Sequence, residues 1–478
     1  MKDYEIVIGL EVHAELNTQS KIYCSCRSAF GMDVNTQICP VCMGLPGALP
    51  TLNEKVVEYA IRMGHALNCH INTVCRQDRK NYFYPDLPKG YQISQADVPL
   101  CENGYLDILV GGEARRIRVN RIHIEEDAGK LLHDGAYPGS LADLNRCGVP
   151  LIEIVSEPDL RSSAEARAYL ETIRSILLCL GISDCKMQEG SIRCDVNVSV
   201  REKGTRELTV RCEMKNVNSF RAAVRGIEYE AKRQIEILEG GGTIIQETRR
   251  WDDGKGMSFP MRTKEDAQDY RYFPEPDLLT IVVDEEKVQA LKESIPELPH
   301  AKIRRYMKDY GFAEIDAALI TEDIERAALF EACAESGRCK PKNICNWILA
   351  DLAKYTNDTG QKISQTPITP KRLTELIEQV EKGVISNTAG KKAFLLMMET
   401  GREPLAIIEE EGMAQNSNRE ELRQLVREVF SDNQKSVLDY RNGKGKALGY
   451  LVGQCMKRSG GKANPSLIRE IVTHMLSE

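Results

Sequence analysis

Apolar and polar side chains alternate along residues 6–16, and we expect much of the N-terminal part of the chain to be built around this segment. Side chains of a strand point alternately to its two faces, so a period of two predicts a β-strand with one apolar and one polar face. The apolar face holds Ile6, Ile8, Leu10, Val12 and Leu16. The polar face carries Glu11, His13 and Glu15, with Gly9 leaving bare backbone beside them. The apolar face needs a core, whereas the polar face suits water, a metal ion or a charged substrate.

The same alternation recurs in later segments and predicts further strands near 105–110, 115–126, 186–200 and 207–217. Their polar faces group Arg121, His123, Glu125 and Asp127; then Arg193, Asp195, Asn197 and Ser199; then Arg211, Glu213 and Lys215. Glu153 stands alone inside the apolar run 151–155, and a carboxylate there needs a partner if it is buried. Strands of this kind predict an antiparallel sheet with helices on one face and an open concavity on the other, although such a face often meets only solvent.

Helical periodicity completes the predicted fold. Before residue 295 it predicts helices over 53–67, 163–180 and 219–238, and Gly240, Gly241 and Gly242 suit the end of the last helix better than a phosphate-binding loop. Later helices are expected over 300–311, 321–336, 340–357, 370–382, 388–399, 418–430, 432–440, 445–458 and 465–476. The sequence therefore predicts an α+β protein with domains at 1–295, 296–405 and 406–478.

The polar strand faces contain the parts of a phosphoryl-transfer site. Carboxylates with one histidine suit Mg²⁺, a hard cation that prefers oxygen ligands. Lysine and arginine beside them suit phosphate oxygens. No G-x-x-x-x-G-K-[ST] loop is present, so ATP binding has no support from that motif. Solvated sheet faces remain the alternative interpretation.

Four cysteines have the spacing of a metal site. Cys24 and Cys26 are separated by twelve residues from Cys39 and Cys42, and two close thiol pairs of this kind can hold Zn²⁺ tetrahedrally. An all-cysteine set predicts a structural rather than a catalytic zinc site. Unliganded thiols are the alternative.

Composition favours a cytoplasmic protein, and the C-terminal end differs from the rest of the chain in its charge. Of the 478 residues, 42% are hydrophobic and 28% charged, with no long apolar run and no signal peptide. The formal net charge is −7, yet residues 431–478 contain eight Lys and Arg against four Asp and Glu. Interleaved with glycines, these cations suit a nucleic-acid surface or simply a solvated helix. The candidate residues are Arg441, Lys444, Lys446, Lys457, Arg458 and Lys462.

Residues 78–91 form an aromatic and basic loop, with four aromatic residues and three cations in fourteen positions. Such side chains can stack on a base. They can equally pack the loop onto the sheet.

Several of these segments resemble the B subunit of the tRNA-dependent amidotransferase. The matching blocks follow the order of that family: VIGLEVH at 7–13, DRKNYFYPD at 78–86, YQISQ at 91–95, EEDAGK at 125–130, PLIEIVSEPD at 150–159, DYRYFPEPD at 269–277, DYRNGK at 439–444 and KANP at 462–465. The blocks extend from residue 7 almost to the end of the chain, and several are long and specific. The family architecture is a cradle domain, a helical domain and a tail domain, which fits the boundaries above.

The resemblance implies a heterotrimer with A and C subunits that converts Glu-tRNA(Gln) to Gln-tRNA(Gln), or Asp-tRNA(Asn) to Asn-tRNA(Asn). The B subunit uses ATP and Mg²⁺ to phosphorylate the side-chain carboxylate of the misacylated amino acid. The A subunit releases ammonia from glutamine, and this ammonia displaces the phosphate. The tail domain contacts the tRNA.

The resemblance also implies roles for individual residues. Catalysis would involve Glu11, His13, Glu125, Glu126, Glu153 and Glu213, and the expected Mg²⁺ ligands are His13, Glu125, Glu126 and Glu153. Alternation places only Glu125, of the adjacent pair, on the face of His123. Lys215, Arg193 and Asn197 are expected to contact ATP because they share the polar face. The complete cysteine quartet, which some family members lack, supports structural zinc.

Two rival functions differ from this expectation. A non-catalytic tRNA-binding scaffold could keep the fold without the kinase step, although the complete acidic set argues against it. A free-standing glutamine amidase is excluded because the sequence has neither a Ser-Ser-Lys nucleophile arrangement in a Gly/Ser-rich segment nor a cysteine in a glutaminase context. The choice between Glu-tRNA(Gln) and Asp-tRNA(Asn) stays open.

Overall fold

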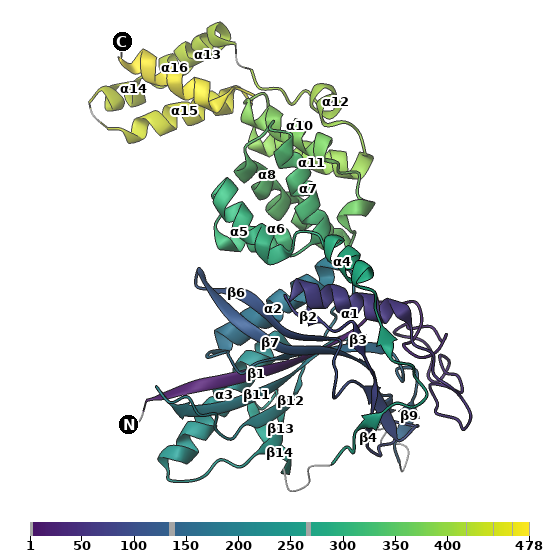
Figure 1. The fold of residues 1–478 in the computed structure, drawn as a ribbon. Coiled ribbons are helices and arrows are strands. Elements are labelled where there is room, and N and C mark those ends of the chain that lie inside the picture. The colour runs from purple at the N-terminus through teal and green to yellow at the C-terminus, as the bar shows by residue number, and fades with distance from the viewer. Residues whose placement is uncertain are drawn as a thin grey trace. The chain divides into compact units, whose positions relative to one another are not determined.

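The chain folds into a strand-rich part followed by a helical part. The computed structural model describes residues 3–132, 139–263, 269–416, 418–442, 444–460 and 462–477, so Gly443 and Gly461 of the basic segment lie outside the described residues. The described chain divides into two compact units, Met1–Lys302 and Ile303–Glu478 (Figure 1). The first unit contains the sheets and the second only helices, which confirms the predicted α+β class.

A nine-stranded sheet forms the centre of the first unit, in the order β14-β13-β12-β11-β1-β10-β7-β6-β2. All neighbouring pairs are antiparallel except β12 and β13, which are parallel. The strands are β1 (Tyr4–Glu15), β2 (His70–Ile71), β6 (Cys101–Val110), β7 (Glu113–Glu126), β10 (Pro150–Ser156), β11 (Ile192–Glu202), β12 (Cys212–Val217), β13 (Glu247–Asp252) and β14 (Met257–Thr263).

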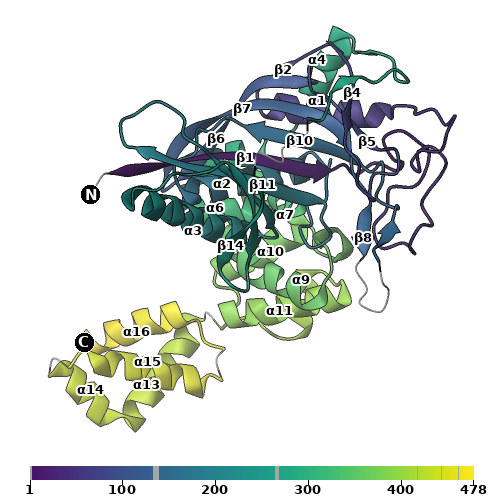
Figure 2. The same cartoon turned by 90° about the horizontal axis from the view of Figure 1, so that it is seen from below.

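Strand β1 is the middle strand of this sheet (Figure 2). Ile8, Leu10 and Val12 are almost completely buried, which confirms the alternation predicted for this segment. The register places His13 opposite Glu153 of β10 on one side and opposite Arg193 of β11 on the other. The polar side chains of neighbouring strands therefore meet on one face of the sheet, as expected for a pleated sheet with one apolar face.

Three helices cover the apolar face: α1 (Glu54–Ala66), α2 (Ser163–Cys179) and α3 (Phe220–Glu239). Their first turns are capped by the side chains of Asn53, Ser162 and Ser219, each of which accepts a backbone N–H. The predicted helices at 53–67, 163–180 and 219–238 are confirmed to within a residue or two.

Short strands form three smaller sheets. They are β3 (Val74–Cys75) with β16 (Ile281–Val282), β8 (Lys130–Leu132) with β9 (Leu141–Asp143), and β4 (Asp78–Asn81) between β5 (Tyr91–Ser94) and β15 (Phe273–Pro274). The last sheet joins the aromatic loop to the distant segment 269–277, and the Arg79 guanidinium reinforces it through both Glu275 oxygens at 2.6 and 2.8 Å. Sequence-distant aromatic segments thus lie side by side.

The second unit is helical and contains two separate groups of buried apolar side chains. Helix α4 (Glu285–Glu293) precedes it and packs on α1. Its helices are α5 (Pro299–Tyr310), α6 (Glu314–Thr321), α7 (Ile324–Glu335), α8 (Pro341–Trp347), α9 (Ala353–Thr359), α10 (Pro370–Glu381), α11 (Asn387–Thr400), α12 (Pro404–Glu410), α13 (Arg419–Asp432), α14 (Gln434–Arg441), α15 (Lys446–Arg458) and α16 (Pro465–Ser477).

Several predicted elements differ from the structure. A π-helical turn, Ile348–Leu352, joins α8 to α9 inside the expected helix 340–357. Helices α4, α6 and α12 were not predicted, since they are short and carry little periodic signal. Strand β11 begins only at Ile192, because residues before it form a turn closed at Gly190 with φ +82°, and β12 begins only at Cys212.

No helix among the described residues is both long and apolar enough to cross a bilayer.

Gly64 of α1 tests how closely helix and sheet pack. A Cβ at this position would lie 2.6 Å from the Cys101 sulfur and 2.7 Å from Cδ1 of Ile71. We expect Gly64→Ala to lower the free energy of unfolding by about 1–3 kcal/mol, because extra volume in a packed core forces neighbours apart. Gly453→Ala is the control: this α15 glycine has open space around its Cβ, so alanine should leave stability equal or higher. Denaturant unfolding of both variants measures the difference, and equal effects would contradict close packing at Gly64.

Candidate active site and metal centre

A cavity of about 410 Å³ opens on the polar face of the large sheet. Its floor consists of side chains from β1, β7, β10, β11 and β12, and its wall includes side chains from β4 and from the segment 269–277. The lining residues are Glu11, His13, Lys80, Ser94, Gln95, Ala96, Arg121, His123, Glu125, Glu153, Asp195, Glu213, Lys215, Tyr270 and Tyr272. Six of the predicted site residues are therefore brought together: Glu11, His13, Glu125, Glu153, Glu213 and Lys215.

Two histidines bracket a buried pair of carboxylates at one end of the cavity. Glu153 lies 3.4 Å from Nε2 of His13 and 3.2 Å from Nε2 of His123. Glu125 lies 3.9 and 3.7 Å from the same two nitrogens. Glu153 therefore has the partners that a carboxylate in an apolar strand requires, which confirms that expectation.

The charges of this group stabilise one another. Burial disfavours the charged imidazolium, but the Glu153 and Glu125 carboxylates outweigh it and raise the pKa of His123 to about 9. Burial opposes the charged form of His13 as well, and the same carboxylates, Glu153 foremost, still raise the pKa of His13 above its usual value. Burial alone would raise the pKa of Glu153, yet His123 and His13 hold it well below the usual value. The raised pKa values of the two histidines and the lowered pKa of Glu153 share one cause, the attraction between imidazolium and carboxylate at this end of the cavity.

A second acidic group occupies the neighbouring strands. One ligand atom each from Glu11, Asp195 and Glu213 lies within 4.8 Å of the others, and the same holds for His13, Glu125 and Glu153. Burial, followed by the charge of Glu153, raises the pKa of Glu11. Such a concentration of oxygen donors fits Mg²⁺, because a divalent cation would relieve the repulsion that raises this pKa.

Lys215 is the cation of this second group. Its ammonium lies 2.6 Å from Asp195 and 2.9 Å from Glu213. Burial disfavours the ammonium, but the two carboxylates outweigh it and raise the pKa of Lys215. It therefore remains charged in the cavity, where a phosphate group could take over one of its contacts.

A second cavity of about 340 Å³ adjoins the first and shares Glu11 with it. It is lined by bare backbone at Gly9, by apolar side chains including Val7, Leu208 and Val210, and by polar groups such as Ser156, Asn197 and Arg211. Asn197 donates its side-chain N–H to Glu11 at 2.9 Å. Asn197 thus links the two cavities rather than lining the acidic one. Leu208 is 65% exposed, an apolar side chain without cover.

Two predicted site residues lie elsewhere. Glu126 points to the opposite face of β7, where it pairs with Lys89 and accepts the Ile93 backbone N–H at 2.9 Å. The strand alternation that brings Glu125 into the cavity necessarily turns Glu126 away. Arg193 is held by Asp127, 2.6 Å from its guanidinium, beyond the cavity lining. The expectation that these two residues share the acidic cavity is therefore corrected.

Several lining residues were not among the predicted site residues. Asp195 and His123 share the alternating faces of Arg193 and Glu125, so the same pattern could have identified them. Lys80, Tyr270 and Tyr272 reach the cavity through the pairing of β4 with β15, which connects segments about 190 positions apart in the chain. Tyr270 packs edge-to-face on Tyr272 at 6.0 Å between ring centroids, and Lys80 lies 5.0 Å from the Tyr270 ring. No local sequence pattern predicts the contact between these distant segments.

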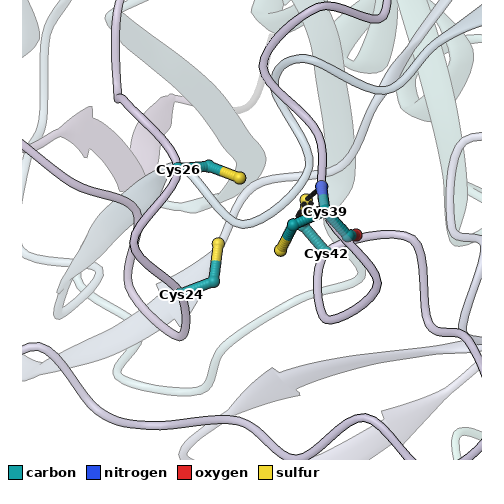
Figure 3. A group of neighbouring side chains, drawn as sticks. All are labelled: Cys24, Cys26, Cys39 and Cys42. Atoms are coloured by element: carbon teal, nitrogen blue, oxygen red, sulfur yellow. Dashed lines mark hydrogen bonds between the residues drawn. The ribbon is translucent and has the colours of Figure 1, made fainter.

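The four cysteines converge in a separate cluster. Cys24 and Cys26 come from one loop and Cys39 and Cys42 from another, with the sulfurs pointing toward one another (Figure 3). All four sulfurs lie within 4.8 Å of one another, and the Cys39 backbone N–H donates to the Cys42 sulfur at 3.1 Å. A tetrahedral zinc ion with bonds of roughly 2.3 Å separates its sulfurs by roughly 3.8 Å, so the quartet fits zinc.

The thiols of this cluster are unequal in acidity. The hydrogen bond from Cys24 lowers the pKa of Cys42 to about 4 against the opposing effect of burial, and the Cys39 backbone N–H and the positive charge of Lys21 lower it further. The same hydrogen bond raises the pKa of Cys24. One thiol is thus ready to ionise, as a metal ligand must.

The six basic residues of the C-terminal segment are all exposed: Arg441, Lys444, Lys446, Lys457, Arg458 and Lys462. Two of them have acidic partners nearby, Lys444 with Asp439 of α14 at 2.9 Å and Arg458 with Glu428 of α13 at 3.4 Å. All six can therefore meet solvent, and their contact with nucleic acid stays a prediction.

Comparison with known proteins gives the class of the chain. Residues 6–289 match the family described as the GatB/GatE catalytic domain, and this match covers the whole acidic cavity. Residues 328–476 match a second family, described as the GatB domain. The first unit is therefore a catalytic domain of the GatB/GatE class.

The chain belongs to the family of B subunits of the aspartyl/glutamyl-tRNA(Asn/Gln) amidotransferase. It is 55% identical over 475 residues to the B subunit from Thermoanaerobacter pseudethanolicus, covering 99% of this chain and all of the relative. It is 56% identical over 479 residues to the B subunit from Caldicellulosiruptor saccharolyticus and 51% identical over 478 residues to a B subunit from Clostridium acetobutylicum, with full coverage of both chains in each case.

Replacing one thiol tests the cysteine cluster. We expect about one zinc ion per chain in the purified protein and a loss of most of it in Cys39→Ser, because a closed site needs all four thiolates. The thermal midpoint should fall as well, since metal binding contributes to folding. Cys147→Ser is the matched control: Cys147 is a buried neighbour outside the quartet, so this variant should keep its zinc. Metal analysis by mass spectrometry decides, and equal zinc in Cys39→Ser and wild type would contradict the site.

Proposed function

We propose that this chain is the kinase and amidation subunit of a tRNA-dependent amidotransferase. It would phosphorylate the side-chain carboxylate of Glu-tRNA(Gln), Asp-tRNA(Asn) or both with ATP, and then allow ammonia to displace the phosphate. The observation that carries the proposal is that one cavity of a GatB-type catalytic domain contains two clusters of carboxylates, one of which contacts Lys215. Ammonia would come from glutamine through the A subunit, with a C subunit completing the heterotrimer.

In this proposal the nucleotide binds across the two adjoining cavities. The apolar cavity around Gly9 and Leu208 has the size and lining for a nucleobase with its ribose, because such sites are mainly apolar with few polar groups. The phosphates would then extend past Glu11, the residue common to both cavities, toward Lys215. This arrangement needs no glycine-rich phosphate loop.

The carboxylates would hold Mg²⁺, which neutralises phosphate oxygens and favours their transfer. The donors lie close together in two separate groups, His13, Glu125 and Glu153 in one and Glu11, Asp195 and Glu213 in the other. Lys215 and Lys80 would supply positive charge to the phosphates and to the approaching carboxylate of the substrate. That carboxylate attacks the terminal phosphorus and ADP leaves. Ammonia then attacks the activated carbonyl carbon, and inorganic phosphate leaves as the amide forms.

Two further parts of the chain would support this reaction. A structural Zn²⁺ would hold the two cysteine loops together within the catalytic domain. The exposed cations of α14, α15 and the segment after them would contact the phosphate backbone of tRNA. Neither part would take a direct role in the chemical steps.

Glu11→Gln separates the kinase from a non-catalytic tRNA-binding scaffold. Glutamine keeps the shape of Glu11 and can still accept from Asn197, but it lacks the charge that both cavities share. We expect ATP-dependent amide formation by the co-expressed complex to fall by at least about 100-fold, the order seen when one electrostatic contact in an active site is removed. Binding of misacylated tRNA should be unchanged. The assay measures ADP release and amidated aminoacyl-tRNA in parallel.

Glu15→Gln is the matched control, because Glu15 lies on the same face of the same strand but outside the cavity. It should retain most of the activity. Normal amide formation by Glu11→Gln would remove Glu11 from the reaction, and complete inactivity of the wild-type complex toward both tRNAs would favour the scaffold.

Leu208→Ala tests the place of the nucleoside. Losing the apolar contact of one leucine weakens binding by about 1–2 kcal/mol, so KM for ATP should rise by roughly 5- to 30-fold while kcat changes little. Leu279→Ala is the control, since Leu279 is 92% exposed and does not line the cavity. Steady-state kinetics at varied ATP concentration give the answer; an unchanged KM would place the base elsewhere.

A further inference from the structure

Lys21 is a completely buried cation next to the cysteine cluster. Its side chain has 0% exposure, which is rare for lysine because an ammonium loses its hydration on burial. The ammonium donates to the backbone carbonyl of Gln37 at 2.8 Å. Within the described parts of the chain, no ion pair joins Lys21 to an aspartate or glutamate, and nearby Glu126 is paired with Lys89. The protein alone therefore gives this charge no carboxylate partner.

Lys21 connects both loops that carry the thiols. Its backbone N–H donates to the carbonyl of Cys26 at 2.9 Å, which ties it to the first pair. Its ammonium bonds Gln37, two residues before Cys39, which ties it to the second pair. The Lys21 stem and Cys42 both border Gly148, since a Cβ placed on Gly148 would lie 3.7 Å from Cδ of Lys21 and 3.7 Å from Cβ of Cys42.

A zinc-loaded cysteine cluster would supply a negative charge as the partner of Lys21. Four thiolates around one Zn²⁺ leave a net charge of −2, which also loses hydration in a partly buried site. A buried ammonium beside it would offset half of that charge.

We propose that Lys21 is a positioning residue of the zinc site, which holds both cysteine loops and balances the charge of the zinc–thiolate centre. The proposal rests on the zinc occupancy proposed above. Its consequence is reciprocal: the lysine strengthens zinc binding, and zinc supplies the counter-charge that makes burial of the lysine tolerable. A purely structural lysine would stabilise the fold equally with or without metal.

Zinc affinity of the full-length chain is the first test. Loss of a supporting group next to metal ligands commonly lowers affinity by about 10- to 100-fold, and we expect a loss in that range for Lys21→Met in competition with a chromophoric chelator. Lys21→Arg, which keeps the charge, should lose less than Lys21→Gln. Lys55→Met makes the same change in net charge at an exposed site and should keep wild-type affinity.

A double-mutant cycle with Cys39→Ser separates charge balance from simple packing. In the zinc-loaded chain, Lys21→Met should lower the midpoint of denaturant unfolding. In the zinc-free Cys39→Ser background the same change should leave the midpoint equal or higher, because it removes a buried charge without a partner. An equal loss in both backgrounds, or unchanged zinc affinity, would overturn the role of Lys21. Absence of zinc from the wild type would instead overturn the zinc site itself. If Lys21→Met does not fold, the comparison of Lys21→Arg with Lys21→Gln decides.

Discussion

The mutual neutralisation of Glu153, His13 and His123 is the constraint around which the catalytic face is built. These side chains lie on β10, β1 and β7, and the antiparallel register aligns Glu153 with both histidines. Buried carboxylates without a counter-charge would repel each other and destabilise the sheet. The imidazoles reduce that penalty, so the sheet can keep carboxylates on the floor of the cavity. A slip of one residue in either strand pair would turn the acid into the core.

The second acidic group follows the same principle with a different cation. Asp195 and Glu213 pair with Lys215, whereas Glu11 accepts the side-chain N–H of Asn197 and has a raised pKa. Within the described part of the chain Glu11 forms no ion pair, and it lies where the apolar cavity joins the acidic one. The Glu11 carboxylate at this junction would attract an incoming metal–phosphate group, which is consistent with the proposed path of the nucleotide.

Strand alternation identified much of this face because the site lies on regular strands whose side chains obey a period of two. It placed Glu11, His13, Glu125 and Lys215 correctly relative to the sheet. It also separated Glu125 from Glu126, although the motif suggested both. Arg193 has the right parity but is drawn to Asp127, a choice made by side-chain electrostatics rather than by backbone. Lys80 and Tyr270 depend on β4 pairing with β15, a long-range contact without local signal.

The cysteine loops also connect to the catalytic strands through packing. Gly44, two residues after Cys42, has φ +67°, and a Cβ there would lie 2.5 Å from Cγ of Lys89. Only glycine allows this conformation and this approach at little cost. Lys89 in turn pairs with Glu126, the neighbour of Glu125 on β7. Ordering of these loops by a metal ion would therefore fix one side of β7 while the histidines fix the other. The strand that carries Glu125 would then be constrained on both of its faces.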